Sequence, residues 1–94
     1  MMNSEVTHNI AAHRFEWGSE AALAICEYSE VAGVWVFTHT YVPDSLRGNG
    51  IASLLLKAAL TAARNSGKRI VPECSFVSAF VQRHPEYQDL LPQR

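Results

Sequence analysis

Residues 41–52 read Tyr41-Val42-Pro43-Asp44-Ser45-Leu46-Arg47-Gly48-Asn49-Gly50-Ile51-Ala52. The stretch joins an apolar run that is typical of a strand to the start of a helical pattern. A helix N-terminus presents unpaired backbone N–H groups and about half a positive charge, which suits an anion. Gly48 and Gly50 remove side chains where a phosphate must approach, and they allow positive φ, so that successive amides converge. With Arg47 as a charged fork near the same oxygens, the stretch predicts a turn that binds a pyrophosphate.

Other phosphate-binding motifs do not fit this turn. It is not a Walker P-loop, because no Gly-Lys-Ser/Thr follows four residues after a glycine. It is not GxGxxG either, because Ser53 stands where the third glycine belongs. The plain alternative is a tight strand-to-helix turn with an incidental arginine, and two glycines alone do not separate these interpretations.

A long helix is predicted directly after the turn. Apolar residues fall at positions 51, 54, 55, 58, 59 and 62, which is the spacing of one helical face. Ser53, Lys57 and Thr61 occupy much of the other side, and Gly67 is a natural stop. The pattern indicates a helix of about 16 residues and about 24 Å.

The residues before the turn are typical of strands. Arg14–Trp17 alternates charged and aromatic residues, and Ala21–Tyr28 follows after a turn. Ser29–Gly33 is interpreted as a hairpin loop, and a third strand runs from Val34 to about Val42. This last run is apolar on both faces, which suits a central strand. The expected arrangement is an antiparallel meander.

The residues after the long helix predict a parallel strand and a second helix. Lys68–Pro72 forms a short strand, and Ser75 caps a helix that runs through Phe76, Val77, Phe80 and Val81 and ends before Pro85. Glu86–Leu91 forms one further turn. A strand, helix, strand order makes the two strands parallel neighbours. The predicted fold class is α/β, with a short mixed β-sheet of an antiparallel meander plus one parallel strand, and with a second C-terminal helix.

Composition limits the classes of function. A chain of 94 residues predicts a single domain over residues 1–94. A net charge of -1 and the absence of a basic run argue against a nucleic-acid or anionic-membrane partner. No apolar stretch approaches a membrane span and the N-terminus lacks a signal-peptide pattern, so the expected location is cytoplasmic. Two cysteines, with no CxxC or paired histidines, predict neither a disulfide scaffold nor a metal site.

The turn resembles a known signature. Arg47-Gly48-Asn49-Gly50-Ile51-Ala52 matches the Arg/Gln-x-x-Gly-x-Gly/Ala motif of the GNAT superfamily of acetyl-CoA-dependent N-acetyltransferases. The chain is more closely similar to a group of very small GNAT-like proteins of plants, bacteria and animals. The matching motifs are His39-Thr40-Tyr41-Val42-Pro43, Arg47-Gly48-x-Gly50, Pro72-x-Cys74-Ser75-Phe76-Val77 and His84-Pro85-x-Tyr87, within residues 38–91.

The resemblance implies a reduced GNAT fold and a cofactor, acetyl-CoA or coenzyme A. It implies that the backbone of Arg47–Ala52 holds the pyrophosphate and that Tyr41 and Val42 pair with the amides of the pantetheine arm. The acceptor is expected to be an amine, on a small molecule or a protein. Larger members have N-terminal helices and C-terminal strands that shape the acceptor site, and this chain has no room for them.

Cys74 is the main candidate for the chemistry. It follows the predicted strand and immediately precedes the second helix, whose dipole favours a thiolate. A free thiol of pKa about 8.5 is only about 3% ionised at pH 7, so a lowered pKa would activate it. In the small family that the chain resembles, a cysteine at this position is proposed as catalytic. Whether Cys74 accepts the acetyl group, acts as a base or is a buried inert thiol stays open.

Other residues are weaker candidates. His39 lies near the end of the strand and titrates near neutrality, although a structural histidine is the plainer interpretation. Glu73 is an alternative base, and Tyr87 could protonate a leaving CoA thiolate or only pack. Cys26 is interpreted as core.

The sequence therefore predicts transfer of acetyl from acetyl-CoA to an amine of unknown identity. The first alternative is a non-catalytic CoA-binding or acyl-CoA-sensing module. The second alternative is a domain that binds a nucleic acid or a protein through the same long helix.

Overall fold

A computed structural model describes residues 6–92 of the chain. The elements are β1 (Thr7–Asn9), β2 (Arg14–Ser19), β3 (Ala22–Val31), β4 (Val34–Tyr41), η1 (Asp44–Leu46), α1 (Ile51–Asn65), β5 (Arg69–Pro72), α2 (Ser75–Arg83) and η2 (Pro85–Leu90).

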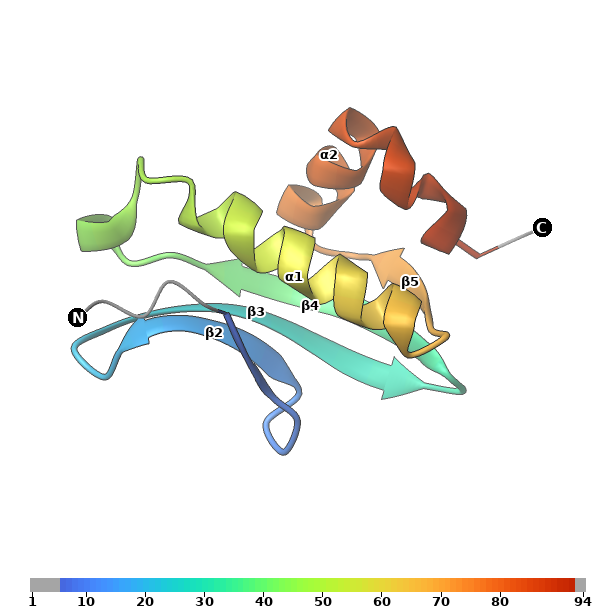
Figure 1. Cartoon of the computed structure of the whole chain (residues 1–94), viewed down its shortest axis with the longest axis horizontal. Helices are drawn as coiled ribbons and strands as arrows, with labels where there is room; N and C mark the ends of the chain where they lie inside the picture. Colours follow the sequence, from blue (N-terminus) through green and yellow to red (C-terminus); the bar gives the residue numbers. More distant parts are fainter. Residues whose placement is uncertain (1–5, 93–94) are drawn as a thin grey trace.

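The strands form one five-stranded sheet in the order β1-β2-β3-β4-β5. β1 to β4 pair antiparallel with their neighbours, and β4 pairs parallel with β5 through the α1 crossover (Figure 1). This confirms the predicted mixed sheet of an antiparallel meander plus one parallel strand. β1 was not predicted, because Thr7, His8 and Asn9 are too short and polar a run to show an alternating pattern.

The hairpin between β3 and β4 is tighter than the sequence predicts. Ser29 to Val31 belong to β3, and Val31 pairs with Val34, so the predicted loop Ser29–Gly33 is wrong. The connection consists of Ala32 and Gly33, whose φ angles are 53° and 79°. Two-residue hairpin turns with positive φ match the twist of the strands, which lets β3 continue to the turn.

α1 covers the sheet with a face that differs from the predicted one. Its buried residues are Ile51, Leu55, Leu56, Ala59, Leu60 and Ala63. The helical period is confirmed, but Leu54 is 38% exposed and the buried stripe is rotated toward Leu56 and Leu60. The helix is apolar on more than one side, so the packing against sheet residues such as Phe15 and Phe37 decides which side is buried.

α2 packs on β4 and β5 and against α1 (Figure 1). Val77, Phe80 and Val81 are its buried residues. The N-cap position is occupied by Cys74, not by Ser75 as predicted, and Ser75 is the first helical residue. The backbone of Cys74 is still extended, with φ of -71° and ψ of 128°, which is the conformation of an N-cap residue and not of the first helical residue.

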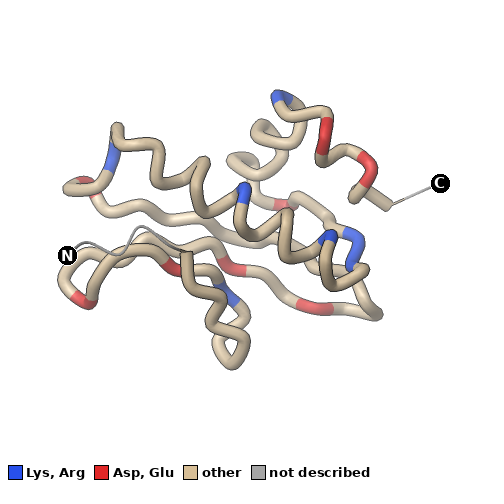
Figure 2. Tube along the Cα trace, viewed as in Figure 1, with Lys and Arg blue, Asp and Glu red and all other residues tan. Residues whose placement is uncertain are grey.

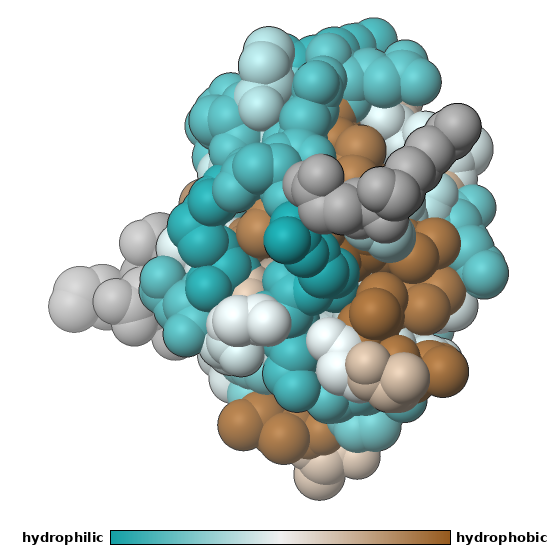
Figure 3. Space-filling view, turned by 90° about the vertical axis from the view of Figure 1, so that its right-hand side faces the viewer, coloured by the Kyte–Doolittle hydropathy of each residue, from teal (hydrophilic) through white to brown (hydrophobic). Residues whose placement is uncertain are grey.

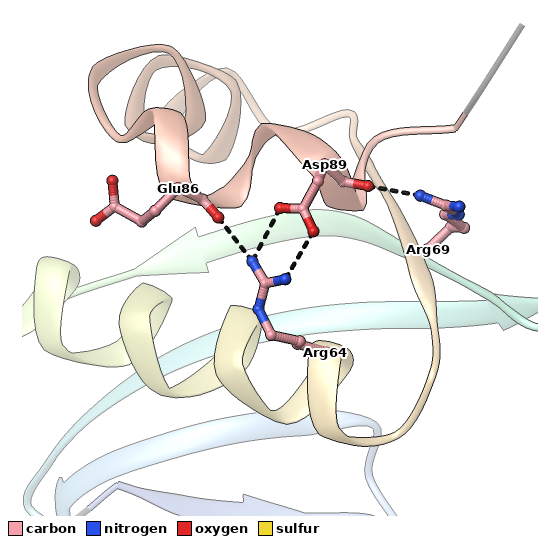
Figure 4. A network of polar contacts seen from close by, with 4 residues as sticks. All are labelled: Arg64, Arg69, Glu86 and Asp89. Atoms are coloured by element: carbon pink, nitrogen blue, oxygen red, sulfur yellow. Dashed lines mark hydrogen bonds and ion pairs between the residues drawn. The ribbon is translucent and has the colours of Figure 1, made fainter.

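The predicted turn after α2 is the 3-10 helix η2, and polar contacts fasten it to α1 and β5 (Figure 4). Arg64 of α1 donates to both carboxylate oxygens of Asp89, at 2.7 and 2.9 Å, and to the Glu86 carbonyl at 2.6 Å. Arg69 donates to the Asp89 carbonyl. The end of the described chain is thus held against the helical layer.

Charge is distributed unevenly between the two halves of the chain. Within residues 6–92, every lysine and arginine except Arg14 lies between Arg47 and Arg83 (Figure 2). Glu16, Glu27 and Glu30 lie on the antiparallel strands. The half of the chain that carries the turn and the helices is therefore the more positive half, although acidic residues are interspersed there too.

The surface at the end of the molecule where α1, η2 and the β3–β4 turn lie is mostly hydrophilic (Figure 3). Hydrophobic residues gather along one side of this view. Val34 and Val36 of β4 and Val71 of β5 alternate with core residues and are half-buried.

None of the helices in the described part of the chain combines the length and hydropathy that crossing a membrane requires.

Candidate functional site

The turn between β4 and α1 has the backbone that its two glycines predict. Gly48 and Gly50 have φ angles of 85° and 73°, in the left-handed region that favours glycine. A β-carbon placed at either residue would meet no other atom within 4 Å, so open space faces the turn at both positions. The turn is therefore shaped for close approach of another group to the backbone.

Backbone N–H groups are available at this turn. The first hydrogen bond of α1 runs from the Leu54 N–H to the Gly50 carbonyl at 3.1 Å. The N–H groups of Ile51, Ala52 and Ser53 precede it at the positive end of the helix. Their arrangement provides several donors for one anion.

A cavity of about 320 Å³ lies against the turn. Its lining is formed by Val42, Leu46, Arg47, Gly48, Gly50, Ile51, Ala52, Ser53 and Phe76. Most of the residues predicted to hold the cofactor thus meet at one cavity. Tyr41 and Asn49 are not part of the lining; Tyr41 is exposed, and the Asn49 side chain donates to the Leu46 carbonyl at 3.3 Å.

The Arg47 side chain braces the turn. Its Nε donates to the Val42 carbonyl at 3.0 Å, and its Nη1 lies 2.9 Å from Asp44 Oδ1. The guanidinium is thus shared between the end of the strand and the 3-10 turn, although it also lines the cavity. The Val42 carbonyl therefore already accepts a hydrogen bond. The peptide groups of β4 before Val42 are the ones that remain for pairing with another extended chain.

β4 and β5 pair over only part of their length. The register pairs Val34 to Phe37 with Arg69 to Pro72, and the Cys74 N–H donates to the Phe37 carbonyl at 2.9 Å. The β3–β4 register shifts at the same level, where Phe37 and His39 face consecutive residues of β3 and leave Thr38 as the extra residue. Beyond this bulge, the described part of β5 does not pair with Thr38–Tyr41. Between the turn and Cys74 this strand edge is thus free of pairing with β5, and its Thr40 backbone contacts the Cys74 sulfur.

Cys74 and Thr40 meet at the start of this open edge. The Cys74 thiol lies 3.7 Å from Thr40 Oγ1, and the Thr40 hydroxyl lies 3.9 Å from the Cys26 sulfur on its other side. Partial burial raises the pKa of the Cys74 thiol. Hydrogen bonds of the Cys74 sulfur with the Val77 backbone, the Thr40 side chain and the Phe76 and Thr40 backbones outweigh burial, and the Cys74 pKa is lowered from its ordinary value.

The second thiol has the opposite environment. Cys26 is fully buried, and this burial raises its pKa to about 12. The interpretation of Cys26 as a core residue is therefore confirmed. Of the two thiols, Cys74 is the one that is partly exposed and has a lowered pKa.

The structure shows no contact between the Cys74 thiol and the side chains of the other candidates, His39, Glu73 and Tyr87, in the described residues. His39 is exposed and pairs with Glu27, and alternation along β4 directs its side chain away from the face of Thr40. Glu73 is exposed. Tyr87 is half-buried and stacks on Phe80 at a ring distance of 6.0 Å. Residues 6–92 contain no cluster of three or more histidine, cysteine or acidic side chains that could hold a metal ion.

Two residues at the site were not assigned a role from the sequence. Phe76 was placed on the apolar face of the second helix, but it is 49% exposed and lines the cavity. Its position immediately before Val77, on a helix buried through Val77, Phe80 and Val81, was the available signal. Thr40 belongs to one of the matching motifs, near the end of the predicted strand, but its contact with two thiols was not predicted, because that contact depends on the strand register.

Comparisons with known proteins agree with this architecture. The family described as GCN5-related N-acetyl-transferase matches residues 14–90. The NMR solution structure of a GCN5-like protein from Staphylococcus aureus has 31% sequence identity and a TM-score of 0.79, and it matches over 100% of this chain and 93% of that one. Protein NATD1 of Bos taurus is 43% identical over 47 residues, which are 50% of this chain and 42% of that protein. This match therefore spans less than half of NATD1.

A mixed sheet with a glycine turn at the N-terminus of its crossover helix defines an α/β domain of the GNAT type. The family match covers most of the chain, and the similar solved structure has the same fold. The chain belongs to the GCN5-related N-acetyltransferase family. The resemblance and the fold class predicted from the sequence are both confirmed.

Proposed function

We propose that the protein binds acetyl-CoA at the turn Arg47–Ala52 and transfers the acetyl group to an amine acceptor. The observation that carries the proposal is the turn itself, where two left-handed glycines and the unpaired amides of α1 face one cavity. A diphosphate in this cavity would be held by neutral donors and the helix dipole. Membership of an N-acetyltransferase family supports acetyl-CoA as the source of that diphosphate.

The open edge of β4 supports the path of the pantetheine arm. Thr38–Tyr41 lies between the turn and Cys74 and does not pair with β5 in the described chain. An extended arm with amide groups would pair with this edge in the way that a strand does. The Val42 carbonyl is engaged by Arg47, so this pairing falls to Tyr41 and the residues before it. The thioester would then rest near Thr40 and Cys74.

The transfer requires a neutral amine. An amine of pKa about 10.4 costs about 4.6 kcal/mol to deprotonate at pH 7, so a base at the site contributes directly to the rate. The amine nitrogen attacks the thioester carbonyl, the C–S bond breaks, CoA leaves as a thiolate and the amine proton goes to the base. Cys74 serves either as this base or as an intermediate acceptor that exchanges thioesters with CoA.

Substitution of Gly50 by asparagine tests cofactor binding. Asparagine tolerates positive φ better than other residues, so the change adds a side chain to the cavity at little cost to the backbone. We expect the affinity for CoA to fall at least tenfold, measured by titration calorimetry. Gly67→Asn is the matched control, because Gly67 has a φ of 69° and open space at the opposite end of α1. Equal affinity in wild type and Gly50→Asn would contradict the proposal.

Substitution of Cys74 by alanine tests the chemistry. We expect CoA affinity to be retained and CoA release from acetyl-CoA in the presence of a panel of primary amines to fall at least tenfold. An acetyl adduct on Cys74, detected by mass spectrometry of wild type, would identify the intermediate acceptor, and loss of turnover without an adduct would identify the base.

Cys26→Ala is the control, because it removes the other thiol and should retain turnover. Wild type that binds CoA but releases none with any amine would favour a non-catalytic CoA-binding module. Turnover that survives in Cys74→Ala would show that Cys74 is not required.

A further inference from the structure

β1 is an edge strand, at the opposite end of the strand order from β5 (dark blue in Figure 1). It consists of three residues, and β2 is its one neighbour in the sheet. Backbone pairing over so short a length contributes little stability by itself. Side-chain contacts therefore decide whether β1 stays on the sheet.

His8 joins β1 to the hydrophobic core. Its half-buried ring stacks on Phe15, with 4.1 Å between the ring centroids and 13° between the ring planes. Its Nε2 lies 2.7 Å from the Tyr28 hydroxyl, and the Trp35 ring meets it edge-on at 5.5 Å. Phe15, Tyr28 and Trp35 are all buried members of the core. The ring of His8 is thus held by aromatic groups of β2, β3 and β4.

A second histidine contacts the same tyrosine. His13 lies in the connection between β1 and β2, with a φ of 54°, and its carbonyl accepts a hydrogen bond from the Tyr28 N–H at 3.0 Å. Its ring stacks on the Tyr28 ring at 5.4 Å. The two imidazoles are therefore close enough for the charge of one to disfavour a charge on the other. We call His8 and His13 the histidine pair.

The surroundings of His8 favour its neutral form. Burial, and then the charge of His13, lower the pKa of His8 from its ordinary value of 6.5. Within residues 6–92, neither member of the histidine pair forms an ion pair with an acidic side chain. The face that α1 turns to the sheet is apolar and adds no charge. A proton on His8 would thus be placed among aromatic rings and beside a second cation.

The acidic groups of the neighbouring strands have other partners. Glu30 of β3 interacts with the charge of His13, but its carboxylate accepts hydrogen bonds from Lys68 and from the Trp35 indole. Glu16 of β2 is bound by Arg14 and Asn9, and the hydrogen bond from Arg14 lowers its pKa below the ordinary value of 4.5. Both carboxylates therefore keep their charge in mild acid, where the histidines titrate.

We propose that the histidine pair is an acid-sensitive contact that holds β1 on the sheet at neutral pH and releases it in mild acid. A histidine with a lowered pKa in the folded state contributes its full stability above the ordinary pKa, and the contribution is lost as the pH falls through the lowered value. Release of β1 uncovers Phe15 and the edge of β2, whose backbone groups can then pair with another strand. The inference does not depend on the cofactor site.

Hydrogen exchange of the β1 and β2 amides tests the proposal. Protection is compared at about pH 7.5 and about pH 5, after correction for the intrinsic pH dependence of exchange. In wild type, protection should fall severalfold in acid, while protection in α1 should stay unchanged. His8→Phe keeps a ring against Phe15 but cannot be protonated, so its protection should be the same at both pH values. In His13→Asn, which tolerates the positive φ, the midpoint of the loss should move up toward the ordinary pKa.

His39→Asn is the matched control, because it removes an exposed histidine outside the cluster and should respond as wild type does. Equal protection of wild type at both pH values, or a loss that persists in His8→Phe, would overturn the proposal. An equal loss in α1 would show general acid unfolding and would overturn it too. Titration of the His8 ring protons by NMR in wild type gives a test that needs no variant: its midpoint should coincide with that of the loss of protection, and separate midpoints would contradict the assignment.

Discussion

Thr40 lies between two thiols whose pKa values are shifted in opposite directions. Its hydroxyl is 3.9 Å from the buried sulfur of Cys26 and 3.7 Å from the half-buried sulfur of Cys74. For Cys26 burial dominates, and the pKa rises to about 12. For Cys74 burial is outweighed by hydrogen bonds with the Val77 and Phe76 backbones and with the side chain and backbone of Thr40, and the pKa is lowered. The difference in pKa between the two thiols thus follows from their hydrogen-bond partners and their exposure to solvent.

Replacement of Thr40 by valine should raise the Cys74 pKa. Valine keeps the shape of threonine and removes the hydroxyl that contacts the Cys74 sulfur, so the Cys74 pKa moves back toward the ordinary value of a thiol. Alkylation of Cys74 at pH 7, followed by peptide mass mapping, should slow severalfold, and the pH midpoint of its rate should move upward. Cys26 should stay unreactive in both proteins and is the internal control. An unchanged midpoint would show that backbone groups, those of Val77, Phe76 and Thr40, set the Cys74 pKa without the hydroxyl.

The residues at the turn show which structural features a single position of the sequence predicts. The positive φ of Gly48 and Gly50 was predicted because glycine is the residue that takes this conformation without strain. The engagement of Arg47 with Asp44 and the Val42 carbonyl was not predicted. A long side chain has many rotamers, and the 3-10 turn that brings these partners within reach is visible only in three dimensions.

At the scale of elements, the long helix and the parallel strand were predictable because period and chain order determine them. α1 begins at the predicted Ile51, and β5 lies beside β4 as the crossover requires. The bulge at Thr38 and the divergence of β5 after Pro72 were not predictable. They arise from register, and register depends on which strands pair and not on the composition of β4 alone.

η2 offers a test of how an element is held in place. Asp89→Ala removes the carboxylate that Arg64 grips with two hydrogen bonds, so the 3-10 helix should open more often (Figure 4). Amide hydrogen exchange over Pro85–Leu90 should accelerate, while the midpoint of urea unfolding changes little because the pair is exposed. Asp44→Ala, which removes another exposed ion-paired acid, should leave exchange in η2 unchanged. Unaltered exchange in Asp89→Ala would show that packing of Leu90 is sufficient.

The same contact has a definite pH dependence. The hydrogen bond from Arg64 lowers the pKa of Asp89 below its ordinary value of 3.8. A group with a lowered pKa in the folded state contributes its full stability above the ordinary pKa. The contribution of Asp89 to η2 is therefore complete at neutral pH and is lost as the pH falls through the lowered value.

At the scale of the whole molecule, the sequence predicted the sheet and the helices, but it did not predict which residues each of them buries or exposes. The α/β class and the mixed sheet followed from two patterns of hydrophobic period joined at one turn. The face that α1 buries and the exposure of Phe76 at the cavity did not, because both depend on contacts between segments far apart in the chain. Phe76 illustrates this limit: a phenylalanine next to a buried valine is ambiguous until the neighbouring helix is in place.

The cavity at the turn is lined by residues from three separate places: Val42 after β4, Ile51 and Ala52 at the start of α1, and Phe76 of α2. A bound molecule that contacts all three would hold together segments that lie far apart in the chain. Its binding free energy would add to the folding free energy of a small domain. The lifetime of the protein against proteases would then follow the cellular supply of that molecule.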